Sequence, residues 1–171
     1  MADEKKFLIV KGVDGEVKVP YELATQWQVI KNMEDLEGFF SDTSAVYDLK
    51  TLLPGEPFAT KKSLELIVEW QEYHVHDPPD LDDDIFKKHQ KEVHPWDREF
   101  FDMPRAVLYD FVKLVNAIGI PDLFESQCRF LYSQMKGKST EEIRKEQNIE
   151  YDFTDEEYAQ IIEETKWCDE H

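Results

Sequence analysis

The sequence is poor in cysteine, in positive charge and in long apolar runs. No secretory signal precedes its two cysteines, Cys128 and Cys168, so we expect reduced thiols in a cytoplasmic or nuclear protein. The 20 basic residues face 38 acidic residues, a net charge of -18, which disfavours nucleic acid and anionic membrane surfaces as partners. No apolar run approaches the roughly 20 residues that cross a bilayer, so no membrane span is predicted.

The composition nevertheless supports a folded core, since 41% of the residues are hydrophobic and 13% aromatic. The 171 residues suit one domain, or one domain with an extension. Short apolar runs at 7–10 and 17–19 flank Asp14-Gly15, which predicts a β-hairpin whose turn requires positive φ. Helical spacing predicts one helix over 21–33, and 34–45 reads as a loop before a strand at 46–49.

The second half reads as helical after a polar interruption. Two prolines and clustered carboxylates predict a mobile acidic loop over about 76–91. Prolines suit the first turn of a helix, and three of them predict helix starts near Pro95, Pro104 and Pro121. A further helix is expected from near Thr60, and Gly119 is expected to end the helix that starts at Pro104.

Two capping boxes stand close together near the end of the sequence. Ser139 precedes Glu142 by three residues, and Thr154 precedes Glu157 by three. In such a box the hydroxyl accepts a backbone N–H, and the glutamate reaches back to the cap. The predicted pair of short helices, followed by Trp167, is a poor design for a closed core. It makes more sense as half of a groove that another protein completes.

Two partial motifs, one for phosphate binding and one for calcium binding, each lack residues that the motif requires. Gly137-Lys138-Ser139 resembles the end of a phosphate-binding loop, but Tyr132 stands where its first glycine is required. The acidic run starting at Asp80 resembles a calcium loop, but Ile85 replaces the turn glycine and Lys91 the bidentate glutamate. We therefore read them as a helix end and a solvated loop.

Side chains that could act as metal ligands or nucleophiles form no recognisable site either. The histidines at 74, 76, 89 and 94 lack metal-ligand spacing, and the cysteines form no Cys-x-x-Cys pair. Cys128 reads as a small core residue and Cys168 as a more exposed thiol. We predict no catalytic residue, no metal and no cofactor.

A long block near the end of the sequence carries a family resemblance. It comprises Met135-Lys136-Gly137-Lys138-Ser139-Thr140-Glu141-Glu142-Ile143-Arg144, then Asn148-Ile149, Asp152-Phe153-Thr154 and Trp167-Cys168. Shorter matches continue upstream at Trp96-Asp97, Asn116, Leu53-Pro54 and Asp14-Gly15-Glu16. The chain thus resembles, over nearly its whole length, the Skp adaptors that bridge F-box proteins to a cullin in SCF ubiquitin ligases.

The resemblance implies an α+β class: a BTB/POZ fold over 5–135, followed by two additional F-box-binding helices over 136–171. It implies a non-catalytic adaptor for ubiquitin-dependent degradation, with F-box proteins and a cullin as partners and self-association as a further possibility. The implied F-box-binding residues are Phe124, Leu131, Met135, Ile143, Ile149, Trp167 and Cys168. The implied cullin-binding residues are Tyr109, Asn116 and Ala117.

The chain departs from the family pattern at several positions. It reads Asn116-Ala117-Ile118-Gly119-Ile120 where the family usually has Asn-Tyr-Leu-Asp-Ile, so a cullin-contacting tyrosine is replaced by Ala117. Loss of an interface aromatic can cost ~2 kcal/mol or more. Trp27, Thr140 and Gln147 also replace the usual Ser, Pro and Phe. Together these changes indicate a divergent paralogue.

Three alternatives stand beside the adaptor that joins an F-box protein to a cullin. Ala117 motivates an F-box-binding or self-assembling protein that does not engage a cullin. An adaptor like elongin C is disfavoured, because that relative stops at the end of the POZ part, whereas helices are predicted after Gly137 here. An enzyme has the least support in the sequence.

Overall fold

The computed structural model describes residues 6–37, 46–52, 59–78, 91–150 and 152–168. Most of the predicted acidic loop over 76–91 lies outside these residues, as does the turn at Leu53-Pro54. The chain divides into two compact units, Met1–Gln134 and Met135–His171. Each unit is described on its own, the first here and the second with the candidate site.

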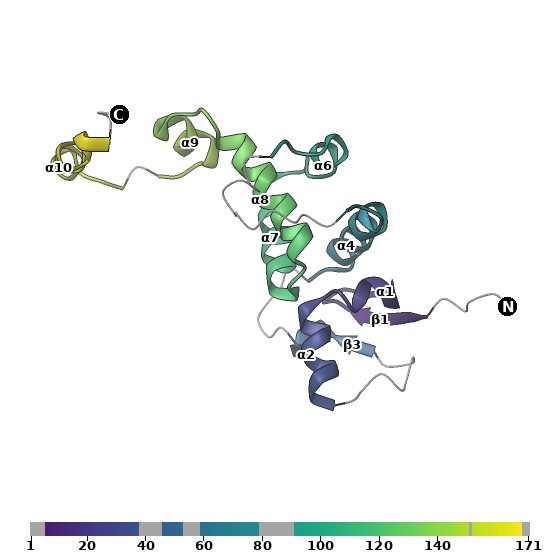
Figure 1. Ribbon diagram of the computed structural model, residues 1–171. Helices are drawn as coiled ribbons and strands as arrows, with labels where there is room; N and C mark the ends of the chain where they lie inside the picture. Colours follow the sequence, from purple (N-terminus) through teal and green to yellow (C-terminus); the bar gives the residue numbers. More distant parts are fainter. Residues whose placement is uncertain (1–5, 38–45, 53–58, 79–90, 151, 169–171) are drawn as a thin grey trace. The chain divides into compact units, whose positions relative to one another are not determined.

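A small sheet forms one side of the first unit (Figure 1). Strand β1 (Phe7–Lys11) pairs antiparallel with β2 (Glu16–Pro20) and parallel with β3 (Val46–Asp48), in the order β2-β1-β3. Side chains alternate between the two faces of a strand, so Leu8 and Val10 are buried whereas Phe7 is exposed. Val17, Val19 and Tyr47 complete the buried face.

The predicted hairpin is present, but the reason given for its turn is wrong. The described glycines with positive φ are Gly119 and Gly137, and neither belongs to this turn. The loop instead closes through Gly12 N, which donates to the carbonyl of Gly15 at 2.8 Å. Gly12 is required for a different reason, because a Cβ there would collide with the carbonyl oxygen of Ala59.

The helix predicted over 21–33 is two helices. α1 (Tyr21–Ala24) ends before Trp27, and α2 (Gln28–Glu37) runs past the predicted end. The Trp27 side chain is fully buried and its Nε1–H donates to Gln71 Oε1 at 2.8 Å. Gln28 N donates to the Gly119 carbonyl at 2.9 Å, so the new helix takes its first partner from a distant segment. The predicted strand over 46–49 is likewise shorter, because Leu49 begins α3 (Leu49–Leu52).

The helix starts predicted near Thr60, Pro95, Pro104 and Pro121 are confirmed. The helices are α4 (Lys61–His74), α6 (Pro95–Phe100), α7 (Arg105–Ile118) and α8 (Pro121–Met135). Thr60 Oγ1 caps α4 by accepting from Ser63 N. Gly119 ends α7 in the left-handed conformation, with φ 76°.

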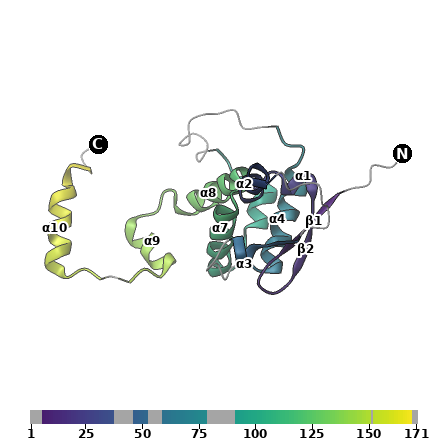
Figure 2. The same ribbon diagram turned by 90° about the horizontal axis from the view of Figure 1, so that it is seen from below.

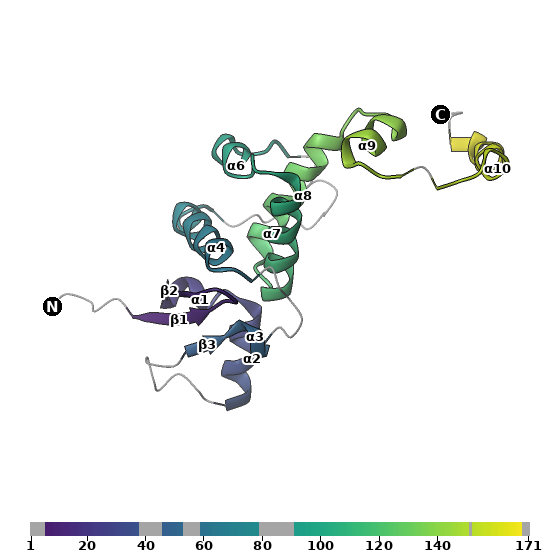
Figure 3. The same ribbon diagram turned by 180° about the vertical axis from the view of Figure 1, so that it is seen from behind.

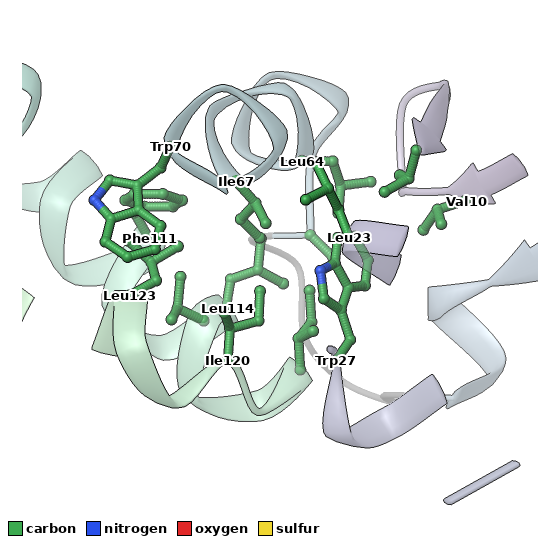
Figure 4. Packing of buried hydrophobic residues seen from close by; sticks show 14 of the residues in the cluster. Val10, Leu23, Trp27, Leu64, Ile67, Trp70, Phe111, Leu114, Ile120 and Leu123 are labelled. Atoms are coloured by element: carbon green, nitrogen blue, oxygen red, sulfur yellow. The ribbon is translucent and has the colours of Figure 1, made fainter. Parts of the chain in front are cut away.

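The core of this unit lies between the sheet and the later helices. α4 packs against β2 on one side and against α7 on the other (Figures 2 and 3). Figure 4 shows the resulting cluster, in which Ile67 of α4 and Leu114 of α7 lie between Trp27 and Trp70. Helices gathered beside a small mixed sheet confirm the α+β class and agree with a BTB/POZ-like fold.

A buried carboxylate joins three of these helices. Asp97 of α6 is 3% exposed. Its Oδ1 accepts from Trp70 Nε1 and His74 Nε2 of α4, each at 2.9 Å. Its Oδ2 accepts from Ser126 Oγ of α8 at 2.5 Å. A buried charge is costly unless it is fully hydrogen-bonded, and these donors meet that requirement.

We expect Asp97→Ala to destabilise the first unit by about 3 kcal/mol, because it leaves buried donors on Trp70 and Ser126 without an acceptor. The free energy of unfolding from chemical denaturation measures this loss. Asp110→Ala is the matched control, since Asp110 is exposed and pairs with Lys113 at 3.2 Å; its effect should stay within about 0.5 kcal/mol. Equal midpoints for the two variants would show that Asp97 has no structural role.

Candidate partner-binding site

Both predicted capping boxes in the second unit are confirmed. They begin α9 (Thr140–Gln147) and α10 (Asp155–Thr165), and a short 3-10 turn, η1 (Lys166–Cys168), follows. Ser139 Oγ accepts from Glu142 N at 3.2 Å, and Glu142 Oε2 accepts from Ser139 N at 2.7 Å. Thr154 and Glu157 repeat this reciprocal pair at 3.3 and 2.9 Å.

The capping glutamates are held in their charged form. The backbone N–H of Ser139, followed by its hydroxyl, lowers the pKa of Glu142. The backbone N–H and hydroxyl of Thr154 lower the pKa of Glu157 in the same way. Hydrogen bonds that form only to a carboxylate favour that carboxylate. The capping contacts at the start of each helix are therefore local in sequence.

Neither α9 nor α10 contains a buried residue. Large apolar side chains of this unit lie in water instead: Ile149 is 55% exposed, Ile162 47% and Trp167 69%. Exposed apolar side chains that lie together mark interaction surfaces more often than single ones do. This unit therefore has the character of a binding surface rather than of a closed core.

A hollow of about 420 Å³ lies within this unit; its lining residues are Thr140, Glu141, Arg144, Ile149, Tyr158, Ile161, Ile162 and Thr165. The α10 members follow the spacing i, i+3, i+4, i+7, which places them on one helix face. The guanidinium of Arg144 also lies 5.6 Å above the ring of Phe153. We call this hollow and its lining the tail groove.

The predicted F-box-binding residues fall in several places. Ile149 lines the tail groove, whereas Ile143 is half-buried outside its lining. Met135 and Trp167 are exposed, at 38% and 69%. Cys168 lies in η1, and its side chain is outside the described part. Phe124 and Leu131 belong to the first unit, where both pack against the core cluster.

The sequence interpretation missed the apolar stripe of α10. Tyr158, Ile161 and Ile162 line the tail groove, yet none was among the predicted residues. Their helical spacing after the Thr154 cap was the available signal. Acidic residues stand on both sides of this stripe in the sequence, so it is less conspicuous than the caps and Trp167.

The predicted cullin-binding residues lie on α7 of the first unit. Tyr109 is 37% exposed and Asn116 is also exposed. Asn116 follows Tyr109 at i+7, so the two residues share one face of the helix. Lys113 lies between them on this face and is also exposed. Ala117 is half-buried at the side of this face.

The histidine and cysteine side chains considered as metal ligands or nucleophiles form no reactive site in the described part of the chain. His74 contacts Asp97 and also Asp77, whose Oδ2 lies 2.6 Å from His74 Nδ1. Among the described residues, no three His, Cys, Asp or Glu side chains gather as a metal site. Cys128 is half-buried rather than a core residue; burial, followed by the charge of Glu125, raises the pKa of its thiol, which disfavours the reactive thiolate. No helix in the described ranges is long and apolar enough to cross a membrane.

Comparison with known proteins places the chain among its relatives. Residues 121–168 match the model of the Skp1 family, dimerisation domain. An E3 ubiquitin ligase complex SCF subunit sconC of Arthroderma benhamiae is 33% identical over 158 residues, which is 91% of this chain and 90% of that protein. The chain belongs to the Skp1 family. A protein of the same name from Arthroderma otae is 31% identical over 91% of this chain and 89% of its own length.

Family membership confirms the resemblance seen in the sequence. The matched family region covers the end of the first unit and the whole of α9 and α10. It therefore includes all the residues that line the tail groove. The assignment of individual residues to partners stays a prediction.

We expect the helical content of the second unit to fall on acidification. Because hydrogen bonds lower the pKa of Glu142 and Glu157, the two caps contribute fully above the ordinary glutamate value of about 4.3. Their contribution is lost as the pH falls through the lowered values. Circular dichroism of the full chain between about pH 6 and pH 2 measures this loss.

Thr154→Ala should weaken α10 by about 1 kcal/mol at neutral pH, because it removes the cap. Thr165→Ala is the matched control: its hydroxyl donates to the Ile161 carbonyl within the same helix, and alanine is at least as good there. If Thr165→Ala lost as much helix as Thr154→Ala, the capping box would not be what stabilises α10.

Proposed function

We propose that this chain is a non-catalytic adaptor of an SCF-type ubiquitin ligase, which holds an F-box substrate receptor through its second unit and a cullin through its first. The observation that carries the proposal is the α9–α10 pair, which has no buried residue but an apolar stripe along its groove. Membership of the Skp1 family and the names of the relatives support the same role.

The tail groove suits an amphipathic helix of the partner. Such a helix inserts its apolar residues, spaced i, i+3, i+4, i+7, into a complementary groove. On this chain, the apolar side chains of Tyr158, Ile161 and Ile162 line the groove from one face of α10. Trp167, at 69% exposed, is the anchor we expect to be covered. Large aromatic side chains carry much of the binding energy of interfaces.

An adaptor needs no reacting group to accelerate a reaction. By binding a substrate receptor and a scaffold together, it raises the effective concentration of substrate near the machinery that modifies it. Four titratable groups have structural contacts that fit this role: Asp97 accepts from His74, and Glu142 and Glu157 serve as caps. We propose that the complex acts in the cytoplasm or the nucleus.

Trp167→Ala should weaken binding to an F-box fragment by ~2–4 kcal/mol, because it removes a partner-facing anchor. Isothermal titration of the full chain measures the change. Phe7→Ala is the matched control, since Phe7 is an aromatic residue that is 40% exposed on β1 in the first unit. An unchanged affinity for Trp167→Ala would remove Trp167 from the site, and no binding by the unmodified chain would refute the adaptor role.

The α7 face with Tyr109 and Asn116 is the surface we assign to the cullin. Ala117 offers less contact area there than the tyrosine usual in the family. That observation favours a second candidate: a protein that binds F-box partners, or assembles with itself, without engaging a cullin. The description of the matched domain as a dimerisation domain is compatible with self-assembly.

Titration against a cullin N-terminal fragment separates the two candidates. We expect measurable binding that improves about tenfold in Ala117→Tyr, because an added interface aromatic contributes ~1–2 kcal/mol. Val107→Tyr is the control for added aromatic area, since Val107 is exposed on α7 two residues before Tyr109 and so on the other side of the helix. Absence of binding by both the unmodified chain and Ala117→Tyr would favour the function without a cullin.

A further inference from the structure

One carboxylate in the wall of the tail groove lies outside the capping box, in the first turn of α9, where its charge also favours the helix dipole. Glu141 lines the groove beside Thr140 and Arg144. The side chain of its neighbour Glu142 accepts from Ser139 N in the capping box. Glu141 is exposed, and it forms no ion pair or hydrogen bond with any residue that the structure describes.

Three positive charges of this unit have other contacts, whereas Lys145 of α9 lies one helical turn after Glu141 and forms no ion pair with it in the described structure. Arg144 lies over the ring of Phe153. Lys138 pairs with Glu146 at 2.6 Å, and Lys166 pairs with Glu163. Residues 135–168 contain five lysine or arginine residues against ten aspartate or glutamate residues. The groove is thus lined by apolar side chains of α10, in a unit with an excess of negative charge.

A partner helix that fills the groove must remove water from Glu141. A carboxylate that loses water without gaining a partner destabilises the complex. The same carboxylate stabilises the complex when the incoming helix brings a lysine or arginine within reach. A charge placed this way therefore discriminates between partners as well as attracting one.

We propose that Glu141 selects F-box segments that carry a lysine or arginine beside their apolar stripe. This rests on the proposed adaptor function, because the occupant of the groove is taken to be an F-box helix. The fitting segment is an amphipathic helix whose aliphatic side chains meet Tyr158, Ile161 and Ile162. Its basic residue lies at the end of the groove formed by the first turn of α9.

The test uses the full chain and an F-box segment that binds it. Glu141→Gln should weaken binding about threefold and Glu141→Lys about tenfold, as expected for one partly exposed charge pair and for its reversal. Glu156→Lys is the matched control: Glu156 is exposed on α10, two residues before Tyr158 and so on the opposite side of the helix. That variant should change affinity less than twofold.

Salt and a charge swap separate the ion pair from other effects. The difference between the unmodified chain and Glu141→Lys should shrink as salt rises from about 0.05 M to about 0.5 M, because salt screens exposed charges. Changing the basic residue of the segment to glutamate should restore binding to Glu141→Lys. Circular dichroism at each step checks that α9 is still helical.

The role of Glu141 and the adaptor function can fail separately in these experiments. Binding of the segment to the unmodified chain with equal affinities for Glu141→Lys and Glu156→Lys would overturn the role of Glu141 and leave the adaptor function standing. No binding to the unmodified chain would refute the adaptor function itself. Loss of affinity in Glu141→Lys without rescue by the charge swap would also overturn the inference, since it would show a helix effect instead of recognition.

Discussion

The carboxylate of Asp97 fixes how the helices of the first unit pack. It accepts hydrogen bonds from Trp70 and His74 on α4 and from Ser126 on α8. Apolar contacts alone leave helices free to slide, because many packings bury similar areas. A buried charge with three donors permits one arrangement, since any other leaves polar groups without partners. The network includes no described residue of α7, but α7 packs against α4, the helix that carries two of the three donors.

Aromatic rings pack around His74, one of the donors to this carboxylate. The ring of Trp70 stacks on it with centroids 4.2 Å apart, and the rings of Tyr73 and Trp96 meet it edge-on at 4.9 and 5.6 Å. Asp97 itself is 3% exposed, and hydrogen bonds are stronger in the low dielectric of such a buried site. In the described part of the second unit, α9 and α10 contain no buried residue and therefore no comparable centre. Its helices depend on Ser139, Thr154 and their paired glutamates, all of which act within a few residues of sequence.

This contrast explains what could be predicted from the sequence. The capping boxes, the helix starts at prolines and the stop at Gly119 depend on neighbouring residues, and the structure confirms them. The break between α1 and α2 depends on Gln71 and on the Gly119 carbonyl, which lie far along the chain, so periodicity over 21–33 could not reveal it. Within the tail groove, Ile149 was predicted from the family resemblance, whereas the α10 stripe needed the structure to show what it lines.

The exposed side chains of the second unit also make recognition sensitive to temperature. Ile149, Ile162 and Trp167 are surrounded by water in the free chain, and a partner that covers them releases that water. Burial of apolar surface carries a negative change in heat capacity, and the hydrophobic contribution weakens on cooling. The affinity of any partner that covers these side chains would therefore vary with temperature, as the stability of a folded core does.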